Sequence, residues 1–488
     1  MSLIYRICFT IKQKGITLKC MKEVLFILER SIKLGSEKIS KLLLEFSIPA
    51  IVGMLVNSLY IVVDRMFIGR VVGAMAISGV SLTFPIAIIV MAFGMLVGIG
   101  AAARISIKLG QNDKQGAEHI LGNALVLLII VSIMVTIAGV ILVNPMLRAF
   151  GGSNNTIGYA REFITIILWG SIFQIIGFGL NNVIRSEGNP KKAMTTMLIG
   201  GITNIILDFL FIYIFHFGIK GAAFATVTAQ CINMIWVLYY FLRGNSLLKI
   251  RKENLILKLE TVTSIFSIGM SPFAMQLAAS VVNIVLNRSL GIYGGDLAIG
   301  AMGIINGIVT VTLMPIFGIN QGAQPVIGFN YGAELYIRVK KALKLAIIAA
   351  TVISTMGALC AHIFPNVLVG FFNKSDANLM AITVNGMKIY MLLFPIVGFQ
   401  VVSSNFFQAI AKAKISMFLA LSRQVIVLIP MLFLLPRFFG LTGVWMAAPV
   451  SDGVASILTA AFLMTQIKKL NSGDKMDSSG NNISLGEV

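Results

Sequence analysis

The sequence predicts an all-α integral membrane protein with twelve transmembrane helices, arranged as two six-helix bundles that repeat in parallel. Hydrophobic residues make up 57% of the 488 residues and charged residues only 12%, with a mean hydropathy of +0.91. This composition is typical of membrane proteins. Twelve apolar segments are long enough to cross a bilayer, and the second six match the first six in order.

Each apolar segment fits one membrane-spanning helix. A hydrocarbon core about 30 Å thick needs roughly 20 apolar residues per helix, and backbone groups in lipid must bond within their own segment. The predicted spans are residues 43–68, 77–103, 118–144, 159–184, 192–216, 219–242, 262–289, 297–327, 338–365, 380–410, 414–436 and 441–466. The first six form an N-lobe over residues 43–242, and the last six form a C-lobe over residues 262–466.

The basic residues orient the chain in the membrane. The net charge of +20 does not point to nucleic acid, because the Lys and Arg residues lie in short loops rather than on a soluble surface. Most of these loops follow the even-numbered spans and therefore lie on one side of the membrane. The positive-inside rule therefore predicts that both termini are cytoplasmic. We expect the protein to lie in the inner (plasma) membrane.

Three segments outside the lobes complete the domain prediction. Residues 1–42 are expected to form a basic amphipathic arm on the cytoplasmic face, without the features of a signal peptide. Residues 243–261 form a basic cytoplasmic linker between the lobes, and residues 467–488 form a disordered cytoplasmic tail.

The two halves of the chain repeat at an interval of 222 or 223 residues. This shift superimposes Pro49 on Pro272, Arg65 on Arg288, Gly100 on Gly322, Lys192 on Lys414, and Phe217 on Phe439. Because six is even, both halves enter and leave the membrane on the same side and are parallel repeats. Such an arrangement places a cleft between two bundles, as in transporters that work by alternating access.

Three stretches carry a family resemblance. "SIPAIVGMLVNSLYIVVDRMFIG", "RSEGNPKKAM" and "GINQGAQPVIGFNYGAELYIRVKKALKLA" resemble the multidrug and toxic compound extrusion (MATE) family, particularly its MepA-like branch, and the resemblance covers roughly residues 40–466. It implies cation-coupled export of amphipathic, often cationic, compounds.

Two carboxylates within the N-lobe spans are the first functional candidates. An ionised Asp at the bilayer centre costs at least about 2.5–3.5 kcal/mol, and Asp64, Asp208 and Asp452 fall well inside spans. Asp64 and Asp208 both lie in the outer half of the N-lobe, on the first and fifth spans. The structural alternative is an interior Asp held by Arg or by the backbone.

The family resemblance implies a cation site around Asp64 and Asp208, completed by Asn181, Asn204 and Thr226. Asn204 shares the face of Asp208, one helical turn earlier. Two neighbouring carboxylates away from water favour retention of a proton, but the same oxygens suit Na⁺. We expect H⁺ rather than Na⁺ as the coupling ion, with Na⁺ at Asp64 and Asp208 as the alternative and no cofactor.

The C-lobe lacks this acidic pair, because Asp64 falls against Asn287 and Asp208 falls against Pro430 or Met431. Its embedded charges, Arg423 and Asp452, favour a structural ion pair over substrate attraction. Polar residues with possible access to a substrate cavity are Gln276, Gln400, Asn405 and Gln408, together with Arg423 and Asp452. Hydrogen bonding between helices explains the four uncharged residues equally well.

These observations predict a multidrug efflux antiporter that exchanges a cation for small amphipathic or cationic molecules by alternating access. The alternative within transport is a flippase for lipids or lipid-linked saccharides. An enzyme is not expected, because no nucleophile–base pair or His/Cys/Asp cluster is evident. A passive channel would not need two matched lobes. The expected partners are the substrates and the lipid bilayer, with no nucleic acid, and we expect a monomer.

Overall fold

The computed structural model describes residues 33–71, 74–150, 154–244, 246–372 and 377–479. Within these ranges the chain is helical and contains no strand, which confirms the prediction of an all-α protein. Residues 1–32 and 480–488, which include most of the predicted arm and part of the predicted tail, lie outside the described residues.

The N-lobe contains six long helices that match the six predicted spans. They are α3 (Ile39–Val71), α4 (Ala74–Gly110), α5 (Lys114–Ala149), α6 (Asn154–Ser186), α7 (Pro190–Asp208) and α8 (Gly218–Leu242). Helix α7 continues directly into a π-helix, η1 (Phe209–Ile214). Most of these helices extend a few residues beyond the predicted spans, because a helix does not end where the hydrocarbon core ends.

The C-lobe follows a linker that contains the short 3₁₀-helix η2 (Lys252–Leu255). Its elements are α9 (Leu259–Gly332), α10 (Tyr336–Ile363), α11 (Pro365–Gly370), α12 (Ala377–Tyr390), α13 (Phe394–Ala409), α14 (Ala413–Leu421), the π-helix η3 (Ser422–Val427) and α15 (Leu428–Ser479). The predicted disordered tail differs from the structure in its described part, where α15 continues as a helix to Ser479. No proline follows Pro449 to end that helix.

Two of the C-lobe helices each contain two spans. A straight helix of the 74 residues in α9 would be about 111 Å long, far longer than a bilayer is thick. The chain reverses instead at Gly295 (φ 65°) in α9 and at Gly440 (φ 57°) in α15, a backbone conformation that glycine adopts without strain. Among the described residues, nine helices are apolar and long enough to span, and α12 and α13 form a tenth span bent by 52°. With the two reversals, the described residues form twelve spans.

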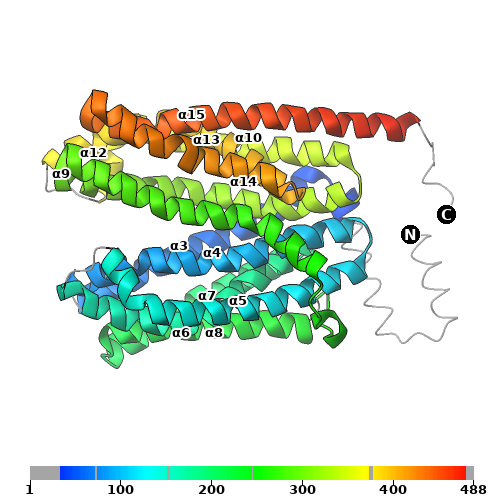
Figure 1. The fold of residues 1–488 in the computed structure, drawn as a ribbon, viewed down its shortest axis with the longest axis horizontal. Coiled ribbons are helices and arrows are strands. Elements are labelled where there is room, and N and C mark those ends of the chain that lie inside the picture. Colours follow the sequence, from blue (N-terminus) through cyan, green and yellow to red (C-terminus); the bar gives the residue numbers. More distant parts are fainter. Residues whose placement is uncertain (1–32, 72–73, 151–153, 245, 373–376, 480–488) are drawn as a thin grey trace.

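The two lobes lie one over the other in Figure 1, with α3 to α8 below and α9 to α15 above. We call the end that carries the loops 111–113, 187–189, 243–258, 333–335 and 410–412 the basic end, because Lys and Arg cluster around these loops. The other end, which carries Gly295 and Gly440, is the opposite end.

The lobes pack backbone to backbone near the basic end, where α4 contacts α9. A methyl group added at Gly269 would lie 1.7 Å from the carbonyl oxygen of Leu96, and one added at Gly100 would lie 2.2 Å from that of Ile265. At Gly110 the corresponding distance to the carbonyl oxygen of Phe329 is 2.0 Å. Only glycine permits so close an approach. We call this contact the glycine seam.

The lobes separate toward the opposite end. On α3, Ser47 and Ile51, which lie toward the basic end, are in contact with glycines of α9. The hydrophobic core has the same division, since one cluster joins both lobes near the basic end, whereas a second cluster contains only C-lobe residues of the opposite half.

Candidate cation site in the N-lobe

Helices α3 and α7 pack side by side with their sequences in register. A methyl group added at Gly53 would lie 2.6 Å from Met197 Sδ, so these two residues face each other across the interface. Met197 follows Gly53 by 144 positions, and Asp208 follows Asp64 by the same number. Parallel helices in this register bring Asp64 and Asp208 to the same level.

The two carboxylates are neighbours in a largely buried position. The charge of Asp64 acts on Asp208, and the Asp208 side chain is completely buried, while Asp64 is half-buried. Among the described residues, neither carboxylate oxygen of Asp208 has a hydrogen-bond partner. A buried carboxylate without a partner is costly when ionised, so this position favours a bound proton or cation.

Asn204 and Thr226 extend the site onto α8. The amide Nδ2 of Asn204 donates a hydrogen bond to Thr226 Oγ1 at 3.4 Å. This leaves the Asn204 Oδ1 oxygen, which is buried and has no hydrogen-bond partner among the described residues, one helical turn before Asp208. The structure therefore brings together four of the five residues that the resemblance implied.

Tyr60 is a member of this group that the sequence did not reveal. It lies one turn before Asp64 on α3 and within electrostatic reach of both Asp64 and Asp208. A tyrosine in an apolar span is unremarkable by itself, and only the register between α3 and α7 identifies it. Its hydroxyl adds a hydrogen-bonding group to the site.

Asn181 lies elsewhere in the N-lobe. Its Nδ2 donates to the carbonyl oxygen of Ala193 at 3.0 Å and to the hydroxyl of Thr196, and its Oδ1 accepts from Arg185 at 2.8 Å. Thr196 precedes Asn204 by eight residues, or about 12 Å along α7. The structure thus places Asn181 in a buried polar cluster toward the basic end and does not bring it to the acidic pair.

The helix geometry changes at the acidic pair itself. Helix α7 ends at Asp208, and the wider π-helical turns of η1 begin with the next residue. Such π-helical segments occur frequently at functional sites. Phe209 in η1 lies 6.3 Å from Phe67 of α3 between ring centroids and 5.5 Å from Tyr213. These rings are apolar neighbours of the acidic pair on the side of the opposite end.

The residues of this site offer mainly oxygen atoms as ligands for a cation. Carboxylate, amide and hydroxyl oxygens suit a proton or a hard cation such as Na⁺ rather than a transition metal. The described residues contain no group of three or more His, Cys, Asp or Glu side chains arranged to hold a metal ion.

The C-lobe candidates occupy different environments. Arg423 Nε donates to Asp452 Oδ1 at 2.6 Å, so the predicted ion pair is present. Gln400 and Gln408 are buried, and Gln400 Nε2 contacts Ser404 Oγ of its own helix at 3.4 Å. Gln276 and Asn405 are half-buried.

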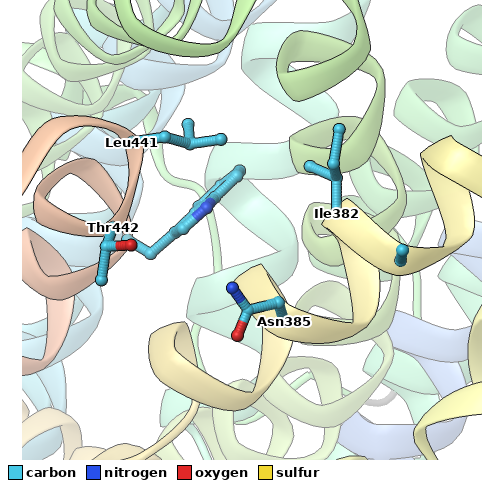
Figure 2. A pocket seen from close by; sticks show the side chains of 6 residues that line it. Ile382, Asn385, Leu441 and Thr442 are labelled. Atoms are coloured by element: carbon cyan, nitrogen blue, oxygen red, sulfur yellow. The ribbon is translucent and has the colours of Figure 1, made fainter.

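A cavity of about 260 Å³ lies near the opposite end of the C-lobe, between α12 and α15. Ala381, Ile382, Asn385, Leu441, Thr442 and Trp445 line it (Figure 2). None of the polar residues predicted for a substrate cavity is among these six. Their contribution to substrate binding stays a prediction.

Comparison with known proteins identifies the family. The MatE family profile matches residues 49–210 and 272–434, once in each lobe and at the interval of the internal repeat. The multidrug export protein MepA of Staphylococcus saprophyticus is 26% identical over 445 residues, covering 91% of this chain and 96% of that protein. MepA of Staphylococcus haemolyticus is 27% identical over 453 residues, covering 93% of this chain and 98% of that protein.

Solved structures share the fold. A transporter of the MOP superfamily from Pyrococcus furiosus superimposes with a TM-score of 0.86 at 24% identity, covering 90% of this chain and 98% of that one. The outward-facing conformation of a multidrug resistance MATE family transporter superimposes with a TM-score of 0.85 at 23% identity, covering 91% and 99% of the two chains. The chain therefore belongs to the MatE family and is a multi-pass membrane transporter, not an enzyme.

Proposed function

We propose that the protein is a cation-coupled antiporter that exports amphipathic, often cationic, compounds by alternating access. The observation that carries this proposal is the acidic pair of Asp64 and Asp208, in which Asp208 is fully buried with no hydrogen-bond partner among the described residues. A transporter that needed no ion would gain nothing from such a costly group. Relatives named as multidrug export proteins support the substrate class.

We propose H⁺ as the coupling ion in preference to Na⁺. Two like charges close together in a buried site favour one proton held between them. Binding of the proton removes the repulsion and changes the packing of α3 against α7. Because the ion and the substrate favour different states of the transporter, each drives the movement of the other.

The basic end is assigned to the cytoplasm by the positive-inside rule, and the protein is assigned to the plasma membrane. The lobes are closed against each other at the basic end and separate at the opposite end. From this orientation we infer an outward-facing state, and we propose that the proton reaches the acidic pair from outside.

The test measures export of a fluorescent cationic dye by everted membrane vesicles, driven by an imposed pH gradient or by an imposed Na⁺ gradient. We expect the pH gradient to drive dye uptake into the vesicles and the Na⁺ gradient not to. Asp64→Asn and Asp208→Asn should each abolish most of this transport. Asp296→Asn is the matched control, because Asp296 is an exposed carboxylate on the turn at the opposite end. Full activity of both Asp64→Asn and Asp208→Asn would refute the proposal. Dye uptake driven by the Na⁺ gradient but not by the pH gradient would identify Na⁺, rather than H⁺, as the coupling ion.

A further inference from the structure

The short segment Lys33–Glu37, which precedes the first span of the N-lobe, is held by the C-lobe. Arg338, in the first turn of α10, donates from Nη2 to the carbonyl oxygens of Leu34 at 3.0 Å and Glu37 at 2.8 Å. Its Nε donates to Asn330 Oδ1 at 2.7 Å, and Asn330 Nδ2 donates to the same Leu34 carbonyl at 3.2 Å. We call the segment Lys33–Glu37 the N-terminal strap.

The N-terminal strap also contacts the N-lobe. The Leu34 side chain is buried, and its Cδ1 would lie 3.6 Å from a methyl group added at Gly188, in the loop between α6 and α7. Lys33 forms a salt bridge of 2.6 Å with Glu45 of α3. The strap therefore bridges the two lobes at the basic end, beside the glycine seam.

The linker before the C-lobe is held by the N-lobe in a comparable way. Asn123 of α5 donates to the carbonyl oxygens of Asn254 at 3.1 Å and Ile256 at 3.0 Å and accepts from the backbone N–H of Lys258 at 2.9 Å. The buried carboxylate of Glu187 accepts further bonds from the linker, including the N–H of Leu247 at 3.1 Å and of Leu248 at 3.2 Å.

The two attachments are related by the internal repeat. Helix α5 begins at Lys114 and α10 at Tyr336, an interval of 222 residues. The same interval places Lys33–Glu37 on residues 255–259 at the end of the linker. Each lobe thus binds, near the start of its third span, the segment that leads into the other lobe. The linker is covalently joined to both lobes, whereas the N-terminal strap reaches the C-lobe only through non-covalent contacts.

We propose that the N-terminal strap is a latch that holds the basic end closed, with Arg338 as the positioning residue that fixes it to the C-lobe. This proposal rests on the alternating access of the proposed function. For the basic end to open, Arg338 must leave the carbonyl groups of the strap or the strap must leave the N-lobe. The strength of these contacts then sets the fraction of molecules that are closed at the basic end.

The test measures how readily the glycine seam opens, without using transport. The four natural cysteines, Cys8, Cys20, Cys231 and Cys360, are first replaced by serine. Ser106→Cys then serves as reporter, because Ser106 is fully buried on α4 and its Cβ would lie 2.9 Å from a methyl group added at Gly328 of α9. A second reporter, Ser132→Cys, is equally buried but lies inside the N-lobe. The rate of alkylation by N-ethylmaleimide is measured for each.

Arg338→Ala should accelerate alkylation of the Ser106→Cys reporter about tenfold or more, because charge-assisted hydrogen bonds are lost. Alkylation of the Ser132→Cys reporter should not change. Lys341→Ala is the matched control, since it removes an exposed cation from the same helix and should leave both rates as they are. If Arg338→Ala is not produced in folded form, Arg338→Lys, which lacks the planar fork, is compared with Lys341→Arg.

Three results would overturn the latch: no acceleration with Arg338 variants, equal acceleration with the Lys341 controls, or equal acceleration at both reporters. The last would mean general destabilisation rather than opening of the seam. None of these results depends on the coupling ion, so a failure of the latch is distinguishable from a failure of proton coupling at Asp64 and Asp208.

Discussion

The glycine seam makes a quantitative prediction for Gly269→Ala. The added methyl group would lie 1.7 Å from the carbonyl oxygen of Leu96, whereas ordinary contact begins near 3.4 Å. Because the obstacle is backbone rather than a flexible side chain, α4 and α9 must move apart by about 1.7 Å to restore ordinary contact. Overpacking of this kind costs about 1–3 kcal/mol. The ratio of molecules closed at the basic end to molecules open there should therefore fall by about five- to 150-fold.

The assay is the distance between spin labels on Gln111→Cys and Leu335→Cys, one in each lobe at the basic end, measured by pulsed electron paramagnetic resonance. Gly269→Ala should add a longer distance to the distribution. Gly303→Ala is the matched control, because it gives α9 the same gain in helix propensity but its methyl group would meet no atom within 4 Å. If the distance distributions of the two variants coincide, the seam does not control closure.

Three further predictions concern stability, measured as thermal unfolding in detergent. Trp445→Ala should cost about 3–5 kcal/mol, because the ring is almost completely buried in the C-lobe core, and a smaller loss would mean that the core collapses around it. Asp452→Leu should cost about 3–5 kcal/mol by leaving Arg423 unpaired, and Arg423→Leu in the same chain should recover most of it if the pair is structural. Asp113→Ala should cost about 1 kcal/mol, since Asp113 caps α5. Lys108, 2.8 Å away, lowers the pKa of Asp113. The ionised Asp113 carboxylate therefore contributes its full stabilisation above pH 3.8, the ordinary pKa, and this stabilisation is lost as the pH falls below the lowered pKa.

The spans were predictable because each is set by one local quantity, the length of an apolar run. Hydropathy also separated the two spans within α9, where the structure reverses at Gly295. The acidic pair was predictable for a related reason, since a carboxylate in a span is conspicuous wherever it lies. What the sequence lacked was the rotation of each helix about its axis. That rotation places Tyr60 at the acidic pair and turns Asn181 toward Thr196 instead.

Inter-lobe contacts were not predictable for a different reason. A glycine in a span indicates close packing but does not name the neighbour, so Gly100 and Gly269 could not be paired from the sequence. The strap was hidden because its bonds use the carbonyl groups of Leu34 and Glu37, which every residue type possesses. The partners on the C-lobe, Arg338 and Asn330, are side chains, but a basic residue after an even-numbered span has an ordinary explanation in membrane orientation.

The two π-helices settle which C-lobe residue is the counterpart of Asp208. A π-helical turn holds one residue more than an α-helical turn, and each fifth span contains such a segment, η1 after Asp208 and η3 from Ser422. The two π-helices lie at different depths, because the repeat interval of 222 residues places η3 opposite residues 200–205, before η1. Between these two positions the C-lobe has one residue more than the N-lobe, so the repeat interval is 223 residues there, a shift equivalent to about 100° of rotation about the helix axis. After η1 the interval is again 222 residues, as for Phe217 and Phe439. Asp208 therefore aligns with Met431 rather than Pro430. A one-residue length change in each lobe was absorbed locally, and an apolar thioether now stands where a second acidic site would need its carboxylate.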